Sequence, residues 1–111
     1  MAETFEIKQG NLLKELEVQF FLPDKKTVVP GLTAGLPIRF HMKATVGGPI
    51  LIDAAATWVD APTAKAKYSW MPGDTDVAGS FIGEFEITIS GKPQSFPTKK
   101  YIPINITAKL A

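Results

Sequence analysis

Apolar and polar residues alternate along most of the chain, and the longest regular stretch runs from Ser80 to Ser90. One side of this stretch carries aromatic and aliphatic residues with a single glycine: Phe81, Gly83, Phe85, Ile87 and Ile89. The other side is polar except for Ile82. A two-residue period is that of a half-buried β-strand, which favours Phe and Ile. We therefore predict a central strand from Ile82 to Ser90.

The same alternation predicts seven further extended segments, at 4–8, 15–22, 37–43, 50–60, 65–70, 94–97 and 101–110. Residues typical of turns separate them. A helix at 12–20 is the competing interpretation of the second segment, but Val18 and Phe20 are poor helix formers and Pro23 follows closely. No segment has the capping signals of a helix. About seven or eight short strands predict an all-β fold, one antiparallel β-sandwich domain spanning residues 1–111.

The alternation also predicts which side chains face the core. We expect the core to contain Leu16, Val18, Phe20, Ile38, Phe40, Met42, Tyr68, Trp70, Phe81, Phe85, Ile87, Ile102, Ile104 and Ile106. Ile7, Leu22, Ile89 and Leu110 also fall on inward positions. For 50–60 the facing stays open. One candidate inward set is Ile50, Ile52, Ala54, Ala56 and Trp58, the opposite set is Leu51, Asp53, Ala55, Thr57 and Val59, and a bulge midway would exchange the two. Pro103 has no backbone donor, so it must lie at an edge or at a strand start.

Two apolar residues, Phe21 and Ile82, are predicted to point outward, where a solvated face would carry polar side chains. Isolated exposed apolar residues are common, so the pattern alone is weak. We interpret both residues as candidates for a surface covered by another subunit.

Composition narrows the classes of partner. The 12 Lys and Arg residues nearly balance 11 Asp and Glu residues, which gives a formal net charge of +1. This balance gives no support to a nucleic-acid or anionic-membrane surface. The absence of cysteine excludes disulfides and thiolate metal sites. We expect no signal peptide and no membrane span, because no basic segment precedes an apolar one and no apolar run is long enough.

No pattern in the sequence predicts a catalytic, cofactor-binding or metal site. Asp74 and Asp76 are two residues apart in a loop, but Ca²⁺ needs about 6–8 oxygen ligands. We therefore favour a turn in which these carboxylates accept hydrogen bonds from nearby groups of the same turn. His41 is the only histidine, and no serine lies in a nucleophile-elbow motif. Trp58 and Trp70 are candidates for sugar stacking, although tryptophan in a small sandwich is more often part of the core. We therefore expect a protein that is not an enzyme.

The segment from Asp76 to Phe81 resembles the lead-in to strand F of immunoglobulin-like domains. It departs from that pattern because Phe81 replaces the usual Tyr and Gly83 replaces the usual Cys. The resemblance implies that the strand at 37–43 pairs with the central strand. Arg39, His41 and Lys43 would then lie opposite Glu84 and Glu86.

Almost the whole chain resembles the N-terminal domain family of phage baseplate upper proteins, which is immunoglobulin-like. The matching segments are FEIKQG at 5–10, IRFHMK at 38–43, DAAAT at 53–57, YSW at 68–70, GDTDVAG at 73–79, FEIT at 85–88, FP at 96–97 and YIPI at 101–104. The resemblance implies a virion structural module, made in the host cytoplasm, that binds neighbouring tail, baseplate or capsid subunits. A homo-oligomer in the particle is compatible with it, and no receptor-binding or coiled-coil part is expected.

Two other function classes stay open. The first is a carbohydrate-binding or adhesion module on the virion exterior, which would need an exposed Trp58 or Trp70. The second is a hydrolase, for which the sequence offers no catalytic set.

Overall fold

The computed structural model describes residues 4–22, 24, 26–96 and 101–110. Within this part the chain forms nine strands: β1 (Phe5–Lys8), β2 (Leu16–Gln19), β3 (Ile38–Lys43), β4 (Ile50–Ala55), β5 (Thr57–Asp60), β6 (Lys65–Tyr68), β7 (Gly79–Ile89), β8 (Lys92–Phe96) and β9 (Ile102–Thr107). The only helical element among these residues is a single 3-10 turn, η1 (Ala61–Thr63). The all-β prediction is confirmed.

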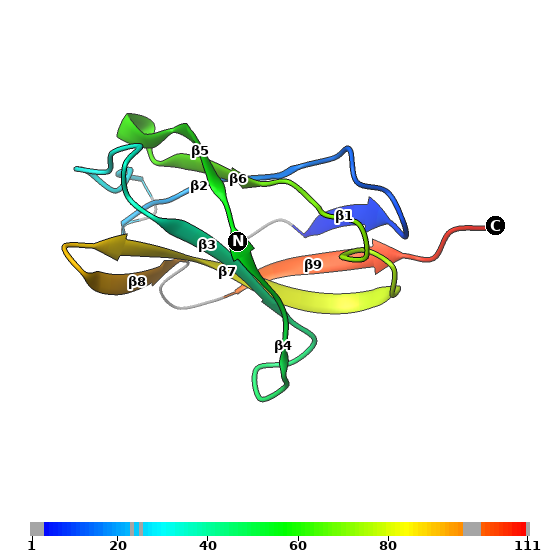
Figure 1. Cartoon of the computed structure of the whole chain (residues 1–111). Coiled ribbons are helices and arrows are strands. Elements are labelled where there is room, and N and C mark those ends of the chain that lie inside the picture. Colours follow the sequence, from blue (N-terminus) through cyan, green and yellow to red (C-terminus); the bar gives the residue numbers. More distant parts are fainter. Residues whose placement is uncertain (1–3, 23, 25, 97–100, 111) are drawn as a thin grey trace.

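The strands form two sheets that lie one over the other (Figure 1). The larger sheet has the order β1-β9-β7-β3-β4, with β8 also paired to β7, and the smaller sheet has the order β2-β6-β5. At 11 residues β7 is the longest strand, and it pairs with β3, β8 and β9. The predicted central strand is therefore confirmed.

One strand pair departs from the antiparallel prediction, because β1 runs parallel to β9. In this register Ile7 lies beside Ile106, and both side chains are buried. A parallel pair needs a long connection, and nearly the whole chain separates these two strands. Alternation within either strand indicates which side faces the core but carries no information on direction.

The predicted strand at 50–60 is divided between the two sheets. β4 pairs with β3 in the larger sheet and β5 pairs with β6 in the smaller one. At the junction the Ala56 N–H donates to the Ile38 carbonyl at 2.9 Å. This division is why nine strands are present where seven or eight were expected.

A bulge does occur in this segment, but at its start and not midway. Met42 lies opposite Ile52 and Lys43 lies opposite Ile50, so Leu51 is an extra residue in β4. The extra residue turns Ile50 outward, where it is 53% exposed, whereas Ile52 is buried. The inward facing is therefore right from Ile52 onward and wrong for Ile50.

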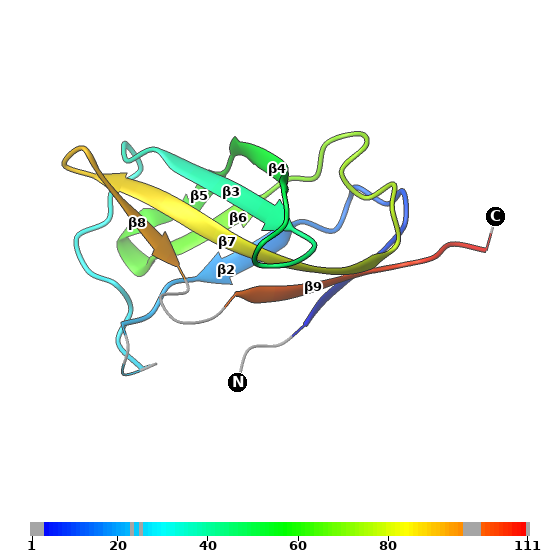
Figure 2. The same ribbon diagram turned by 90° about the horizontal axis from the view of Figure 1, so that it is seen from below.

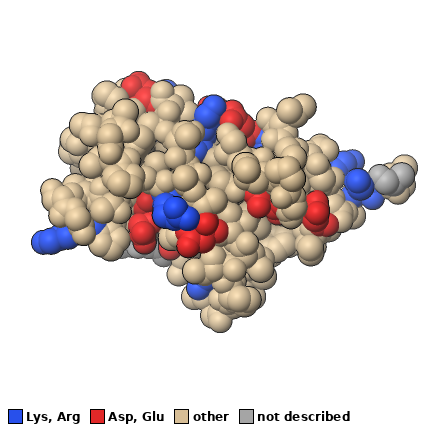
Figure 3. All heavy atoms as spheres, in the orientation of Figure 1, with Lys and Arg blue, Asp and Glu red and all other residues tan. Residues whose placement is uncertain are grey.

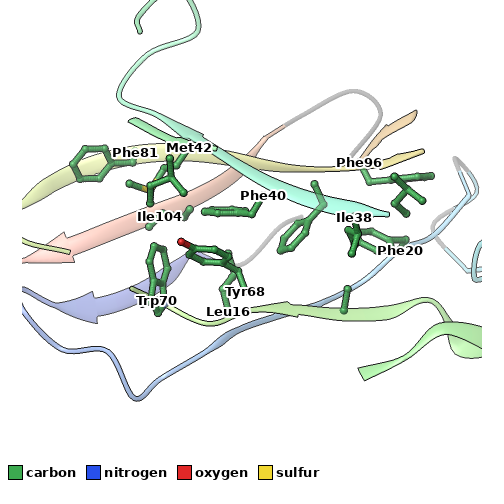
Figure 4. Packing of buried hydrophobic residues seen from close by; sticks show 14 of the residues in the cluster. Leu16, Phe20, Ile38, Phe40, Met42, Tyr68, Trp70, Phe81, Phe96 and Ile104 are labelled. Atoms are coloured by element: carbon green, nitrogen blue, oxygen red, sulfur yellow. The ribbon is translucent and has the colours of Figure 1, made fainter. Parts of the chain in front are cut away.

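The core lies between the two sheets (Figure 4). All the predicted core residues are buried except Val18 and Ile102, which are partly buried and pack against the others. Leu22, Ile89 and Leu110 were expected inward but are exposed. They lie at or beyond the ends of β2, β7 and β9, where the opposite sheet no longer covers the alternating positions.

Phe40 is the centre of the aromatic packing. Its ring centroid lies 4.7 Å from that of Tyr68, 5.1 Å from that of Phe85 and 5.9 Å from that of Trp70. The ring packs over the backbone of Gly83, because a Cβ there would be 2.8 Å from Phe40 Cε1 and 2.9 Å from Ile104 Cδ1. The absent side chain of Gly83 thus makes room for Phe40.

The two unusual proline positions have local explanations. Ile89 pairs with Lys92, so Ser90 and Gly91 form a two-residue turn with positive φ angles of 51° and 77°. The turn thus begins before the predicted 91–93, and Pro93 lies in β8, whose other edge is unpaired among the described residues. Pro103 is near the start of β9, ahead of the β1 pairing that begins at Ile104, as predicted.

Candidate functional site

A hollow of about 80 Å³ lies on the outer face of the larger sheet, between β7 and the hairpin that joins β3 to β4. Its lining residues are His41, Lys43, Val46, Ile82, Gly83, Glu84 and Tyr101. Figure 1 shows the hairpin projecting below the sheet, and Figure 2, seen from below, shows it passing across β7. We call the lining residues together with Ile50 the hairpin face.

Strand register places these side chains side by side. Lys43 lies opposite Ile82 and His41 opposite Glu84 in the antiparallel β3–β7 pair. Ile50 lies opposite Lys43 on the other side of β3. The neighbours of these positions, such as Phe40, Met42 and Phe85, point into the core, so the alternation turns the hairpin-face side chains outward.

The hairpin face exposes more apolar surface than a solvated sheet needs. Val46 is 61% exposed, Ile50 is 53% exposed and Tyr101 is 41% exposed, and the partly buried Ile82 lies between them in the hollow. In Figure 3 the projecting hairpin is a largely uncharged lobe below a band of charged atoms. Contiguous apolar surface with a polar border is typical of an interaction site.

The pairing of β3 with β7 is confirmed, but the predicted charge pairs are not the ones that form. Arg39 lies opposite Glu86, yet its Nε donates to Asp53 Oδ1 and its Nη2 to the Asp53 carbonyl, both at 2.8 Å. His41 Nε2 lies 3.1 Å from the same Asp53 Oδ1. Among the described residues no ion pair joins Arg39 to Glu84 or Glu86.

Asp53 therefore pairs with Arg39 and His41, two of the three basic residues on the outer face of β3. The bond from Arg39 lowers the pKa of the Asp53 carboxyl, and the charges of Arg39 and His41 act in the same direction. This carboxylate was missed as a partner because the facing of 50–60 was ambiguous. Beside it, Lys43 and Glu84 belong to none of the ion pairs found in the described part of the chain.

The two predicted interface residues do not form one surface. Ile82 lines the hollow of the larger sheet. Phe21 follows β2 of the smaller sheet, is 40% exposed and bridges to Val28 in a short hairpin. The prediction that both lie on the outside agrees with their exposure, and only Ile82 lies in the hollow.

The predicted turn is present at Asp74, whose carboxylate accepts local hydrogen bonds, whereas no such bond to the Asp76 carboxylate is found among the described residues. Asp74 Oδ2 accepts bonds from the Met71 N–H at 2.8 Å and from the Tyr68 hydroxyl at 2.5 Å. Burial, and then the bond and charge of Asp74, raise the pKa of the Tyr68 hydroxyl. Among the described residues no three His, Asp or Glu side chains gather in an arrangement that suits a metal ion.

Neither tryptophan offers an open stacking surface. Trp70 is 4% exposed within the aromatic core. Trp58 packs against the core with its ring edge-on to Phe20, and its Nε1–H donates to the Leu36 carbonyl at 3.0 Å. The interpretation of both as packing residues is confirmed.

Sequence reasoning missed most of the hairpin face. Val46 was assigned to a turn, the facing of Ile50 was left open and Tyr101 was expected only to begin the last strand. An available signal was Val46 itself, since an apolar residue beside Gly47 and Gly48 is unusual in a turn exposed to water. The hollow depends on the hairpin crossing β7, which local patterns do not encode.

Comparison of the chain with models of known protein families, with curated proteins and with solved structures gave no match. In the described part of the chain no helix is long and apolar enough to cross a membrane. The function must therefore be argued from the hairpin face and from the residue patterns of the chain.

Proposed function

We propose that this chain is a phage virion structural protein, a non-catalytic assembly module of the tail, baseplate or capsid surface that binds neighbouring subunits. The observation that carries the proposal is the hairpin face, where Val46, Ile82 and Tyr101 line the hollow and the exposed Ile50 lies beside Lys43. Burying apolar surface releases about 25 cal/mol per Å², so such a face is stabilised when a partner covers it. The resemblance of almost the whole chain to a phage baseplate domain supports a virion subunit as the partner.

The fold in this proposal is an immunoglobulin-like sandwich. The order β2-β6-β5 is compatible with strands B, E and D of such domains, and β3, β7 and β9 with C, F and G. β4 would be the added strand C′ beside C. β1 departs from the constant-type arrangement because it lies beside β9 and not beside β2. Gly83 stands at the position of the usual strand F cysteine, and the Phe40 ring occupies the space that a side chain there would need.

The alternative of a carbohydrate-binding or adhesion module is less well supported. It was tied to an exposed tryptophan, and both tryptophans are engaged in packing. The hairpin face has Tyr101 as its only aromatic ring, beside aliphatic side chains that suit a protein partner.

A charge placed in the hollow tests the proposal. Ile82→Glu should remove the chain from particles, because the cost of burying a carboxylate in the contact exceeds what its attraction to Lys43, the residue opposite, returns. The matched control is Thr88→Glu, on the same face of β7 but outside the hollow. Both variants are expressed during phage production, and the chain is quantified by mass spectrometry in purified particles and in the soluble fraction.

The expected result is that Ile82→Glu remains folded and soluble but is reduced at least about tenfold in particles, whereas Thr88→Glu is incorporated like the wild type. Equal incorporation of both variants would place the contact elsewhere. Absence of the wild-type chain from particles would refute the virion role itself.

A further inference from the structure

We infer that the hairpin face binds the hairpin face of a second copy of this chain about a twofold axis, an inference that rests on the proposed function. The surface is self-complementary in charge. Lys43 and Glu84 line the same hollow on neighbouring strands, with Ile82 directly opposite Lys43. Neither charge takes part in an ion pair among the described residues.

A twofold interface brings the same patch of both subunits together, so residue i of one contacts residue j of the other and the reverse. Lys43 and Glu84 satisfy this rule, because they are diagonal neighbours on β3 and β7, both adjacent to Ile82, and a twofold axis can exchange their positions. The axis would bring Lys43 of each copy to Glu84 of the other. Because Ile82 and His41 occupy the other two diagonal positions, it would bring each of them to its own counterpart. Two charge pairs would then flank an apolar contact between the two Ile82 side chains.

The shape of the face is also self-complementary. The hairpin is a projection that carries Val46, which is 61% exposed, and it adjoins a hollow of about 80 Å³. A water molecule takes up about 30 Å³ of the liquid, so the hollow has room for one small aliphatic side chain. Figure 2 shows the hairpin lying across β7, so each copy carries both the projection and the hollow that adjoins it.

Charge reversal at these two positions gives a sharp test. In a homodimer, Lys43→Glu brings two carboxylates together at both contacts, and Glu84→Lys brings two ammonium groups together at both. A 1:1 mixture of the two variants restores opposite charges at both contacts of the heterodimer, because the reversed side chains meet at one contact and the unchanged ones meet at the other. The double variant restores opposite charges at both contacts of a homodimer.

The charge pattern of the mixture follows from the twofold rule. In the heterodimer, the Lys43→Glu copy carries two acidic groups on its face and the Glu84→Lys copy carries two basic groups. Each contact therefore joins one acidic group to one basic group, so both contacts are attractive. Association through a different surface would not be weakened by each single reversal and restored in the mixture.

We would measure self-association of the full chain by sedimentation equilibrium from about 10 μM to about 1 mM, in low salt so that the charges are not screened. The wild type should dimerise, each single variant should bind at least about tenfold more weakly, and the mixture and the double variant should return to within about threefold of the wild type. Thermal unfolding of each variant checks that the fold is intact.

Matched controls are Glu17→Lys and Lys65→Glu, exposed charges on β2 and β6 of the other sheet. These variants should leave the dimerisation constant unchanged. A wild-type chain that stays monomeric to about 1 mM, or dimers that resist both reversals, would overturn the inference. If the chain is monomeric and Ile82→Glu is still lost from particles, a different subunit occupies the hairpin face, so the second copy is refuted while the proposed function stands.

Discussion

Gly83 makes the most specific packing prediction, because its replacement by alanine changes one methyl group at the centre of the core. The new Cβ would lie 2.8 Å from Phe40 Cε1 and 2.9 Å from Ile104 Cδ1. Carbon atoms pack best at about 3.5–4.0 Å, so both partners have to move by more than half an ångström relative to the new methyl group. Phe40 is fully buried against Tyr68 and Phe85, which limits such movement.

Overpacking of this kind costs about 1–3 kcal/mol. Alanine recovers part of that cost, since it restricts the unfolded chain and stabilises by about 0.4–1 kcal/mol where the backbone is compatible. We therefore expect Gly83→Ala to lower the free energy of unfolding by about 1–2 kcal/mol. For a domain of this size that corresponds to a fall in Tm of roughly 4–8 °C.

Urea unfolding of the variant and of two companions measures this effect. Gly35→Ala is the control, because a Cβ at Gly35 meets nothing within 4 Å and should leave stability unchanged or slightly higher. Phe40→Leu in the Gly83→Ala background removes the clashing ring atoms, so the two substitutions should couple by at least about 0.5 kcal/mol. A Gly83→Ala protein as stable as Gly35→Ala, without coupling to Phe40, would refute the packing account.

The other predictions concern the core and two groups with shifted pKa values. Phe85→Ala should cost about 3–5 kcal/mol in denaturant titration, because Phe85 is fully buried between Phe40 and Phe20, and a loss below about 1 kcal/mol would contradict its facing. Arg39→Met should raise the pKa of the Asp53 carboxyl, because the bond from Arg39 lowers it in the wild type. The stability that this bond adds is present at neutral pH and is lost as the pH falls through the folded-state pKa of Asp53. An unchanged NMR titration of Asp53 in the variant would refute the pair. The pKa of the Tyr68 hydroxyl is raised in the folded state, so its contribution to stability is present below the ordinary pKa of tyrosine and declines as the pH rises above it. Tyr68→Phe should therefore lose less stability between about pH 9 and pH 11 than the wild type. An identical decline in both proteins would be inconsistent with a protonated, buried hydroxyl.

The core could be predicted from the sequence because each strand buries one of its two faces. The side chains of β7 alternate without interruption from Phe81 to Ile87, and every inward residue among them is buried. The same rule failed where an inserted residue shifts the period. Leu51 in the β4 bulge turned Ile50 outward, and no local feature of the sequence marked the position of that bulge.

The hairpin face was only partly predictable for a different reason. The outward direction of Ile82 follows from alternation within β7, so that residue could be identified. The hollow also needs Val46 from the β3–β4 hairpin and Tyr101 next to β9, which come together only when three distant segments are paired. Arg39 likewise bonds to Asp53 across a register that the ambiguous facing of 50–60 did not fix.

The central claim is that the hairpin face is covered in an assembled particle, and lysine footprinting tests it most directly. Intact particles and the isolated chain, the latter diluted until sedimentation shows it to be monomeric, are acetylated briefly in the same buffer, and the modification of Lys43 and Lys65 is compared by mass spectrometry. Lys43 lines the hollow, whereas Lys65 is exposed on β6 of the opposite sheet. The account predicts that Lys43 is protected in particles and reactive in the isolated chain, while Lys65 reacts in both. Equal reaction of Lys43 in the two samples would contradict it.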